Sequence, residues 1–337
     1  MKTIVFFNDR AGVGKTTLVY HLAWMFAELG LSVLAADLDP QANLSSLFLD
    51  EDLLEELWTE PRTPRTVLGS LLPMMEGTGE VATPWIAQIA SGIGLVVGDL
   101  ALSARLEDGL SLGWLNGLER EPNALRDFAA FWRLLALAAA ARQADVVLID
   151  VASNLGALNR AVLSSASQVV IPLVPDLYSI QGLSHLGATL HGWQEGWRGR
   201  LASAPETSRT APFPGGAMEP VGYVMLQHPV RLDRPVMAYK RWLHQVPAMY
   251  AGAVLNQAPE LPAATPNDDP HCLAQLRHYR SLMPLAQEAR KPMFYLTPAD
   301  GTLGGHLQAV LACRKEFRAL AEELAGRCGL QLPASAL

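Results

Sequence analysis

The sequence has little cysteine, little charge and no long apolar run. Its cysteines (Cys272, Cys313 and Cys328) lack the spacing of metal ligands, and an odd number of them in a chain of 337 residues predicts reduced thiols in a cytoplasmic protein. No apolar run approaches the roughly 20 residues that a membrane span requires. The first residues lead directly into an apolar stretch, so we expect neither a signal peptide nor a membrane partner.

Charged residues make up only 18% of the chain, whereas apolar residues make up 50%, which predicts a sizeable core and excludes global disorder. The net charge of −7 is unevenly distributed. Residues 1–150 carry 10 Lys and Arg against 20 Asp and Glu, and residues 151–337 carry 16 against 13. An anionic partner would therefore meet the second half, although an ordinary solvated surface explains the same distribution.

One stretch near the start organises the rest of the chain. The apolar run Ile4–Phe7 leads into the small-residue turn Asn8–Gly14, and an amphipathic segment follows the sequence Gly-Lys-Thr-Thr. Strand, glycine-containing loop and helix form the layout of a P-loop, in which backbone N–H groups hold phosphate oxygens. In that layout Lys15 reaches the outer phosphates and Thr16 offers a hydroxyl to Mg²⁺. Taken alone, the stretch also fits an incidental glycine-rich turn.

Two later strand patterns each end in carboxylates. The apolar run Ser32–Asp37 continues into Leu-Asp-Pro-Gln-Ala-Asn, which places Asp37 and Asp39 two residues apart. The run Val146–Asp150 ends in one carboxylate, which is the Walker B pattern. Carboxylates that leave the C-terminal ends of strands beside a P-loop lie where Mg²⁺ and an attacking water are needed. An acidic surface turn is the alternative for the first pair.

Ordered motifs make the sequence resemble the ParA branch of the ParA/MinD-type P-loop ATPases, which have a deviant Walker A motif. The loop is similar to the family's K-G-G-x-G-K-(S/T), with Arg10 for the leading lysine and Ala11 for the first glycine. The segment from Asp150 keeps the Leu-Gly of the family's D-x-P-P-x-L-G but neither proline. Three further stretches resemble family motifs: Asp37–Asn43 (D-x-D-P-Q-(G/A)-N), Pro175–Leu183 and Ala286–Met293.

The resemblance implies an α/β, P-loop NTPase-like fold: a mostly parallel, twisted β-sheet flanked by helices on both faces. We expect a single domain over residues 1–328, with insertions near 50–92, 198–219 and 250–270 and a short tail at 329–337. The residue patterns predict helices over 50–57, 66–75, 123–141 and 177–197, and a loop over 198–219. They also predict a C-terminal helix with one apolar face, made of Leu307, Val310, Leu311, Phe317, Leu320 and Leu324.

The resemblance further implies ATP or ADP as ligand, Mg²⁺ as cofactor and slow hydrolysis of ATP to ADP and phosphate. It assigns catalytic roles to Lys15, to Asp39, which orients the attacking water, and to Arg10. Thr16 would bind the metal, with Asp37 and Asp150 in its outer shell. The nucleotide-binding residues would be Ala11, Gly12, Val13, Gly14, Lys15, Thr16, Thr17 and, at the adenine, Pro292.

Arg10 and Ala11 are the departures with the largest expected consequences. In the family the leading lysine contacts nucleotide across a homodimer that forms on ATP binding. A guanidinium binds phosphate oxygens through a planar fork, so Arg10 can replace that lysine across the dimer or within its own subunit. Alternatively, Arg10 faces solvent and the family's function is lost. The methyl group of Ala11 is expected to strain the loop or crowd the dimer, so we expect altered dimerisation.

Basic residues of the second half are candidates for nonspecific DNA contact. Aromatic residues interleave them at Tyr239 and Trp242, and phosphate contacts of this kind are sensitive to salt. Local ion pairs or a solvated helix face explain the same pattern. The candidates are Arg231, Arg234, Lys240 and Arg241.

Three functions compete. The first is a ParA-like ATPase switch that moves or positions DNA or a protein cargo in the cytoplasm, associated with the nucleoid and stimulated by an unidentified partner protein. The second is a metabolic P-loop enzyme of the synthetase or amidotransferase type, against which the sequence shows no glutaminase-like Cys/His set. The third is a nucleotide-binding adaptor with little hydrolysis. The uncharged tail, interrupted by Pro333, argues against a MinD-like membrane helix.

Overall fold

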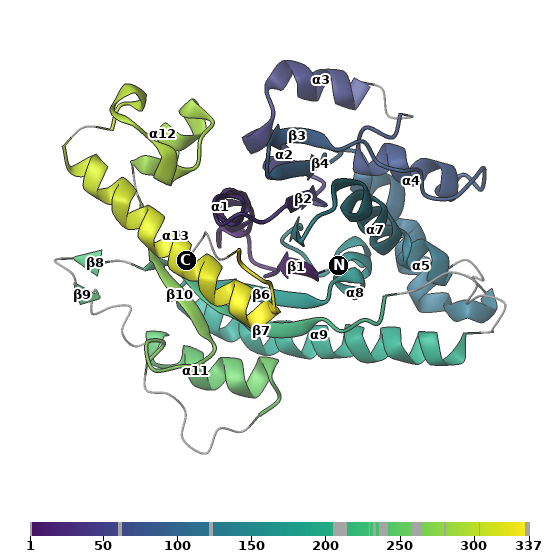
Figure 1. Ribbon diagram of the computed structural model, residues 1–337. Coiled ribbons are helices and arrows are strands. Elements are labelled where there is room, and N and C mark those ends of the chain that lie inside the picture. The colour runs from purple at the N-terminus through teal and green to yellow at the C-terminus, as the bar shows by residue number, and fades with distance from the viewer. Residues whose placement is uncertain are drawn as a thin grey trace.

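The computed structural model describes residues 2–59, 63–120, 124–204, 214–228, 230–231, 234–235, 242–257, 265–279, 281–302 and 304–333 (Figure 1). Its centre is an eight-stranded sheet with the order β10-β7-β6-β1-β5-β2-β4-β3. Every neighbouring pair is parallel except β3–β4. The strands are β1 (Lys2–Phe6), β2 (Val33–Asp37), β3 (Ala87–Ala90), β4 (Ile93–Val96), β5 (Val146–Asp150), β6 (Gln168–Leu173), β7 (Glu219–His228) and β10 (Cys272–Arg277).

The central strands are apolar on both faces because helices cover both sides of the sheet. All five residues of β2 and of β5 are buried, as are all six of β6. Along β1, Ile4 and Phe6 belong to one apolar core, and Val5 belongs to the other, together with Phe7 just after the strand. The predicted class, a mostly parallel sheet between two helical layers, is confirmed.

Two helical layers enclose the two cores. One contains α1 (Lys15–Glu28), α2 (Asn43–Phe48), α3 (Glu51–Thr59), α12 (Leu282–Ala289) and α13 (Gly305–Cys328), with 3₁₀ turns η3 (Met293–Tyr295) and η4 (Pro298–Asp300) nearby. The other contains α4 (Val67–Met75), α5 (Leu102–Arg120), α6 (Ala124–Phe128), α7 (Ala130–Arg142), α8 (Ala157–Ser165), α9 (Leu177–Ser203), α11 (Val246–Met249) and the π-helix η2 (Tyr250–Val254). Figure 1 shows α9 as the long helix beneath β6 and β7.

Three sequence-based expectations need correction. The single helix predicted over 123–141 is two, α6 and α7, separated by Ala129. Residues 198–203 are helical, not loop, because Trp197 is buried and the Arg200 guanidinium lies 3.8 Å from the Trp114 ring, so the end of α9 packs against α5. Leu307 and Leu311 are 46% and 60% exposed, so the buried face of α13 begins only at Val310.

Other expectations hold or fall outside the described residues. The helices predicted over 50–57 and 66–75 are α3 and α4, and the Thr66 hydroxyl caps α4 by accepting a hydrogen bond from the Gly69 N–H at 3.1 Å. Parts of two predicted insertions, residues 205–213 and 258–264, lie outside the described residues. Among the helices that the structure describes, none is long and apolar enough to cross a lipid bilayer.

Close packing between α9 and η2 gives a stability prediction. A Cβ at Gly187 would lie 2.0 Å from the Ala253 carbonyl oxygen, whereas a Cβ at Gly192 on the same helix meets nothing within 4 Å. We expect Gly187→Ala to lower the free energy of unfolding by about 3 kcal/mol through backbone overpacking. The control Gly192→Ala should raise it by about 0.5–1 kcal/mol through helix propensity. Urea denaturation measures both, and a neutral Gly187→Ala would contradict the observed contact.

Candidate nucleotide-binding site

The loop between β1 and α1 has the backbone of a phosphate-binding loop. Gly12 and Gly14 have φ of 75° and 84°, values that favour glycine, and α1 begins directly afterwards at Lys15. The Asn8 side chain holds this loop to the sheet: its amide donates to the Pro172 carbonyl at 2.8 Å, and its oxygen accepts from the Arg10 N–H at 2.9 Å. No motif in the sequence points to this role of Asn8, which only the contact with the neighbouring strand β6 reveals.

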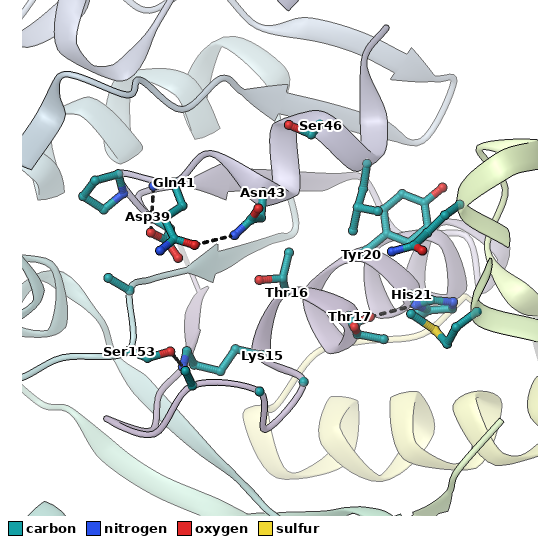
Figure 2. A pocket seen from close by; sticks show the side chains of 18 of the residues that line it. Lys15, Thr16, Thr17, Tyr20, His21, Asp39, Gln41, Asn43, Ser46 and Ser153 are labelled. Carbon is teal, nitrogen blue, oxygen red and sulfur yellow. Dashed lines mark hydrogen bonds between the residues drawn. The ribbon is translucent and has the colours of Figure 1, made fainter. Parts of the chain in front are cut away.

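A cavity of about 870 Å³ opens above this loop, a size typical of small-molecule sites. Figure 2 shows Lys15 and Ser153 at one side of it, Thr16 near the middle, and Tyr20 and His21 at the other side. The wall therefore combines the P-loop, the segments that follow β2 and β5, and α12. The predicted residues on the wall are Ala11, Gly12, Gly14, Lys15, Thr16, Thr17 and Asp39.

Lys15 is the central cation of the site. Only 6% of it is exposed, and its ammonium donates to the carbonyls of Asn8 at 2.9 Å and Arg10 at 3.2 Å and to the Ser153 hydroxyl. Burial lowers the pKa of Lys15, an effect that the nearby carboxylates of Asp150 and Asp39 oppose. The Ser153 hydroxyl lies in the segment after Asp150, where the resemblance predicts prolines. The serine at a position where a proline was expected is the sequence signal that could have pointed to Ser153.

The buried carboxylates of β2 and β5 meet behind Thr16. The two strands pair so that Asp37 lies opposite Asp150, and both residues are fully buried. Asp37 accepts hydrogen bonds from the Ser45 N–H and hydroxyl, both at 2.7 Å. Neither oxygen of Asp150 accepts a hydrogen bond within the described residues. Burial and then repulsion from Asp37 raise the pKa of Asp150 well above its usual range, although the nearby Thr16 hydroxyl and Lys15 ammonium oppose the rise.

This arrangement fits a magnesium ion. An unpaired buried carboxylate is stabilised by a nearby cation, and the Thr16 hydroxyl is the kind of oxygen ligand that Mg²⁺ prefers. Within the described part of the chain, no three His, Cys, Asp or Glu side chains converge to hold a metal. A magnesium ion here would therefore depend on Thr16, water and phosphate oxygens, with Asp150 behind them.

Asp39 lies on the cavity wall and is held in a defined position. It is 8% exposed, and its Oδ1 accepts a hydrogen bond from the Gln41 N–H at 2.9 Å (Figure 2). The hydrogen bond at Oδ1 thus fixes the side chain of Asp39, which still lines the cavity. This placement is the one that a group orienting a water needs.

The loop after β5 lacks the family's prolines but is held by side chains. The Asn159 amide donates to the carbonyls of Ala152 and Asn154, both at 2.8 Å. Glu107 of α5 accepts from the first N–H groups of α8, Ala157 at 2.5 Å and Leu158 at 3.0 Å. The segment that carries Ser153 is therefore restrained by hydrogen bonds in place of proline rings.

His21 joins the P-loop helix to the far wall of the cavity. Its Nε2 accepts from the Met293 N–H at 3.1 Å, so Nδ1 carries the proton and donates to the Thr17 carbonyl at 2.8 Å. Burial lowers the pKa of His21 to about 4. Pro292 is buried beside this bridge, while its neighbours Arg290 and Lys291 line the cavity. A contact of Pro292 with nucleotide therefore stays a prediction, and the sequence analysis did not single out His21.

Arg10 is bound to its own chain. Its Nη1 donates to both carboxylate oxygens of Asp176, at 2.5 and 2.6 Å, and to the Ser179 hydroxyl at 2.9 Å. The guanidinium also lies 5.7 Å from the Tyr178 ring centre. Arg10 is therefore not a purely solvent-facing substitution. Ala11 does not adopt a positive φ, so the expected backbone strain at its methyl group is absent.

Two of the four candidate DNA-contact residues lie on a short two-stranded ribbon. Arg231 pairs with Arg234 in a two-stranded ribbon of β8 (Val230–Arg231) and β9 (Arg234–Pro235), which Figure 1 shows apart from the main sheet. Their side chains are not among the described ones, and Lys240 and Arg241 lie outside the described residues. DNA contact by these four residues stays a prediction.

Comparison with known proteins now identifies the family. The AAA_31 family, described as an AAA domain, matches residues 1–103 and 128–202, more than half of the chain. The chain belongs to the ParA/MinD-type P-loop ATPases. The three segments of the candidate site all lie inside the matched residues: the P-loop, Asp37–Asn43 and the strand that ends at Asp150.

Named relatives of this type are partitioning and cell-division proteins. The cell division protein PomZ of Myxococcus xanthus is 28% identical over 57% of this chain and 52% of its own. The chromosome-partitioning ATPase Soj of Thermus thermophilus is 30% identical over 60% of this chain and 66% of its own. The chain thus spans about half to two thirds of the length of these curated relatives.

The structural comparison shows the same fold. A Cyanothece McdA variant solved as an ATP complex has a TM-score of 0.60 and 17% identity, and the match covers 99% of this chain and 98% of that one.

The His21 bridge predicts a pH dependence. The unfolded chain takes up a proton on His21 near pH 6.5 and the folded chain only near pH 4, so this contribution to stability is complete above pH 6.5. It falls by about 3 kcal/mol at most as the pH drops toward 4. We expect the stability advantage of wild type over His21→Gln in urea denaturation to shrink over this range. The same comparison with His185→Gln, at an exposed position, is the control; a flat His21 comparison would contradict the bridge.

Proposed function

We propose that this protein is a ParA-like molecular switch that binds and slowly hydrolyses ATP and dimerises in the ATP state. Its role would be to partition or position DNA or a protein cargo. The observation that carries the proposal is the unpaired, buried carboxylate of Asp150 behind Thr16, beside the buried ammonium of Lys15. A buried carboxylate that accepts no hydrogen bond, beside a buried ammonium, fits a site completed by a magnesium nucleotide.

The residues support phosphoryl transfer to water without a covalent intermediate. Backbone N–H groups of the loop from Ala11 to Thr17 would bind phosphate oxygens at the N-terminus of α1. Lys15 would exchange its bonds with two loop carbonyls and Ser153 for the β- and γ-phosphates. Asp39, fixed by Gln41, would orient the attacking water. Mg²⁺ bound at Thr16 would neutralise phosphate charge.

Apolar side chains around Arg10 support the dimer part of the proposal. Leu155, Leu177 and Tyr178 are 39%, 43% and 74% exposed and belong to the segments that follow β5 and β6, as the P-loop follows β1. Because β5, β1 and β6 are neighbours, these segments leave the same edge of the sheet. A second copy of the chain placed over this edge would bury them together with Arg10.

The names of the relatives support the proposed class of cargo. Soj is named as a chromosome-partitioning ATPase and PomZ as a cell division protein, and the McdA variant was solved with ATP. These names favour positioning of DNA or of a protein assembly over small-molecule synthesis. An unidentified partner protein that stimulates hydrolysis belongs to the same proposal. The adaptor and metabolic alternatives differ from it in measurable ways.

Two substitutions test the assigned chemistry. We expect Lys15→Ala to lower ATP affinity by about 10- to 100-fold, because a charge-assisted contact to two phosphates is lost. Asp39→Ala should keep ATP affinity and lower hydrolysis by about 100-fold, because the water loses its orienting group. A fluorescent ATP analogue measures binding, and phosphate release measures hydrolysis.

The control is Lys315→Ala on the exposed face of α13, which should change neither quantity. Tight ATP binding without measurable hydrolysis, in wild type as in Asp39→Ala, would favour the adaptor function. Absence of ATP binding by wild type would refute the proposal.

DNA binding is tested by replacing the four basic residues. If Arg231, Arg234, Lys240 and Arg241 all contact phosphates, raising salt from about 50 to 200 mM should weaken wild-type binding to duplex DNA by about 100-fold. The fourfold alanine variant should bind weakly and with almost no salt dependence, whereas Arg198→Ala, an exposed residue on α9, should behave as wild type. Wild-type affinity that does not change with salt in fluorescence anisotropy would contradict this mode.

A further inference from the structure

One carboxylate connects the P-loop to a distant helix. Asp176 follows β6 and is the N-cap residue of α9, where its Oδ1 accepts from the Ser179 N–H at 2.9 Å. The same side chain receives both short hydrogen bonds from Nη1 of Arg10, at 2.5 and 2.6 Å. The Ser179 hydroxyl, at 2.9 Å, is a third acceptor for that nitrogen. Asp176 therefore fixes the direction of the Arg10 side chain.

The ion pair between Arg10 and Asp176 is weak enough for another anion to replace the carboxylate. Burial alone would raise the pKa of Asp176, but hydrogen bonds from Arg10 and from the Ser179 N–H hold it below its usual range. The side chains of Arg10 and Asp176 are 36% and 28% exposed, and ion pairs this open to water contribute little to stability. A stronger anion can therefore displace the carboxylate without unfolding the loop.

Phosphate is such an anion. A guanidinium binds carboxylate and phosphate with the same planar set of donors. The N–H groups of Nη1 that point at Asp176 therefore cannot donate to a phosphate oxygen at the same time. A triphosphate carries more charge than one carboxylate, and ADP lacks the terminal group. Competition for Arg10 would then depend on which nucleotide is bound.

We propose that Asp176 is a positioning residue that keeps the Arg10 guanidinium on its own subunit until nucleotide phosphates at the interface of two ATP-loaded copies displace it. The inference rests on the proposed ATP-dependent dimerisation and adds a residue that regulates it. Asp176 opposes the ATP-dependent dimerisation, because each dimer must break two such pairs. In this inference, Nη1 of Arg10 binds either Asp176 or a phosphate oxygen across the dimer, and not both.

The decisive variant is Asp176→Asn. Asparagine is as good an N-cap residue as aspartate, so its side-chain oxygen can still accept from the Ser179 N–H and α9 keeps its start. The substitution removes only the negative charge that competes for Arg10. We expect it to tighten the ATP-dependent dimer by about tenfold, because two weak pairs no longer need to be broken. With ADP it should have no effect.

Sedimentation equilibrium with ATP–Mg²⁺ or ADP measures the dimer dissociation constant for wild type, Asp176→Asn, Arg10→Ala and the double variant. Arg10→Ala should weaken or abolish the dimer, and in its background Asp176→Asn should change nothing. Glu80→Gln, which removes the partner of Arg133 from a surface pair of 2.9 Å, is the matched control and should leave dimerisation unchanged. Tightening that persists without Arg10, or no tightening at all, overturns the inference.

Binding of a fluorescent ATP analogue separates this inference from the proposed function. A wild type that binds ATP but stays monomeric contradicts the proposed dimerisation of the native chain. Asp176→Asn then decides the inference alone: a dimer formed only with ATP supports it, and a monomer overturns it. A wild type that binds no ATP refutes the proposed function and the inference together.

Discussion

The in-register pairing of β1, β5 and β2 is the constraint on which the site depends. It places the P-loop, the end of β5 and the end of β2 side by side, with Phe6 opposite Asp150 and Asp150 opposite Asp37. Parallel strands direct all three connections to one edge of the sheet. A shift of one residue in either pair would turn the carboxylate to the other face and separate it from Thr16.

The polar groups of the site divide into those that fix geometry and those that await a ligand. The amides of Asn8 and Asn159 and the hydroxyl of Ser45 donate hydrogen bonds within the protein and hold the three loops. Asp150 is buried without a donor, and Lys15 has only neutral partners. A buried carboxylate without a donor is costly in an interior, so its presence beside a buried lysine marks a place where function, not stability, determined the residues.

Much of the fold and of the site could be predicted because its signals are local. The glycines of the P-loop follow from the backbone conformation that they alone favour, and buried strands ending in Asp37 and Asp150 follow from apolar runs and their last residue. The face of α13 was predicted less well. Leu307 and Leu311 fit the helical period, but nothing local says where the helix leaves the sheet.

The sequence by itself determined the order of strand, loop and helix, the class of the fold and the lysine, threonine and carboxylates of the site, because each depends on neighbours within a few residues. Only the tertiary structure decided the partners of those groups. Arg10 meets Asp176 across 166 residues, Lys15 meets Ser153 across 138, and His21 meets Met293 across 272. Contacts over such separations are set by sheet order and helix packing, and these are properties of the whole chain.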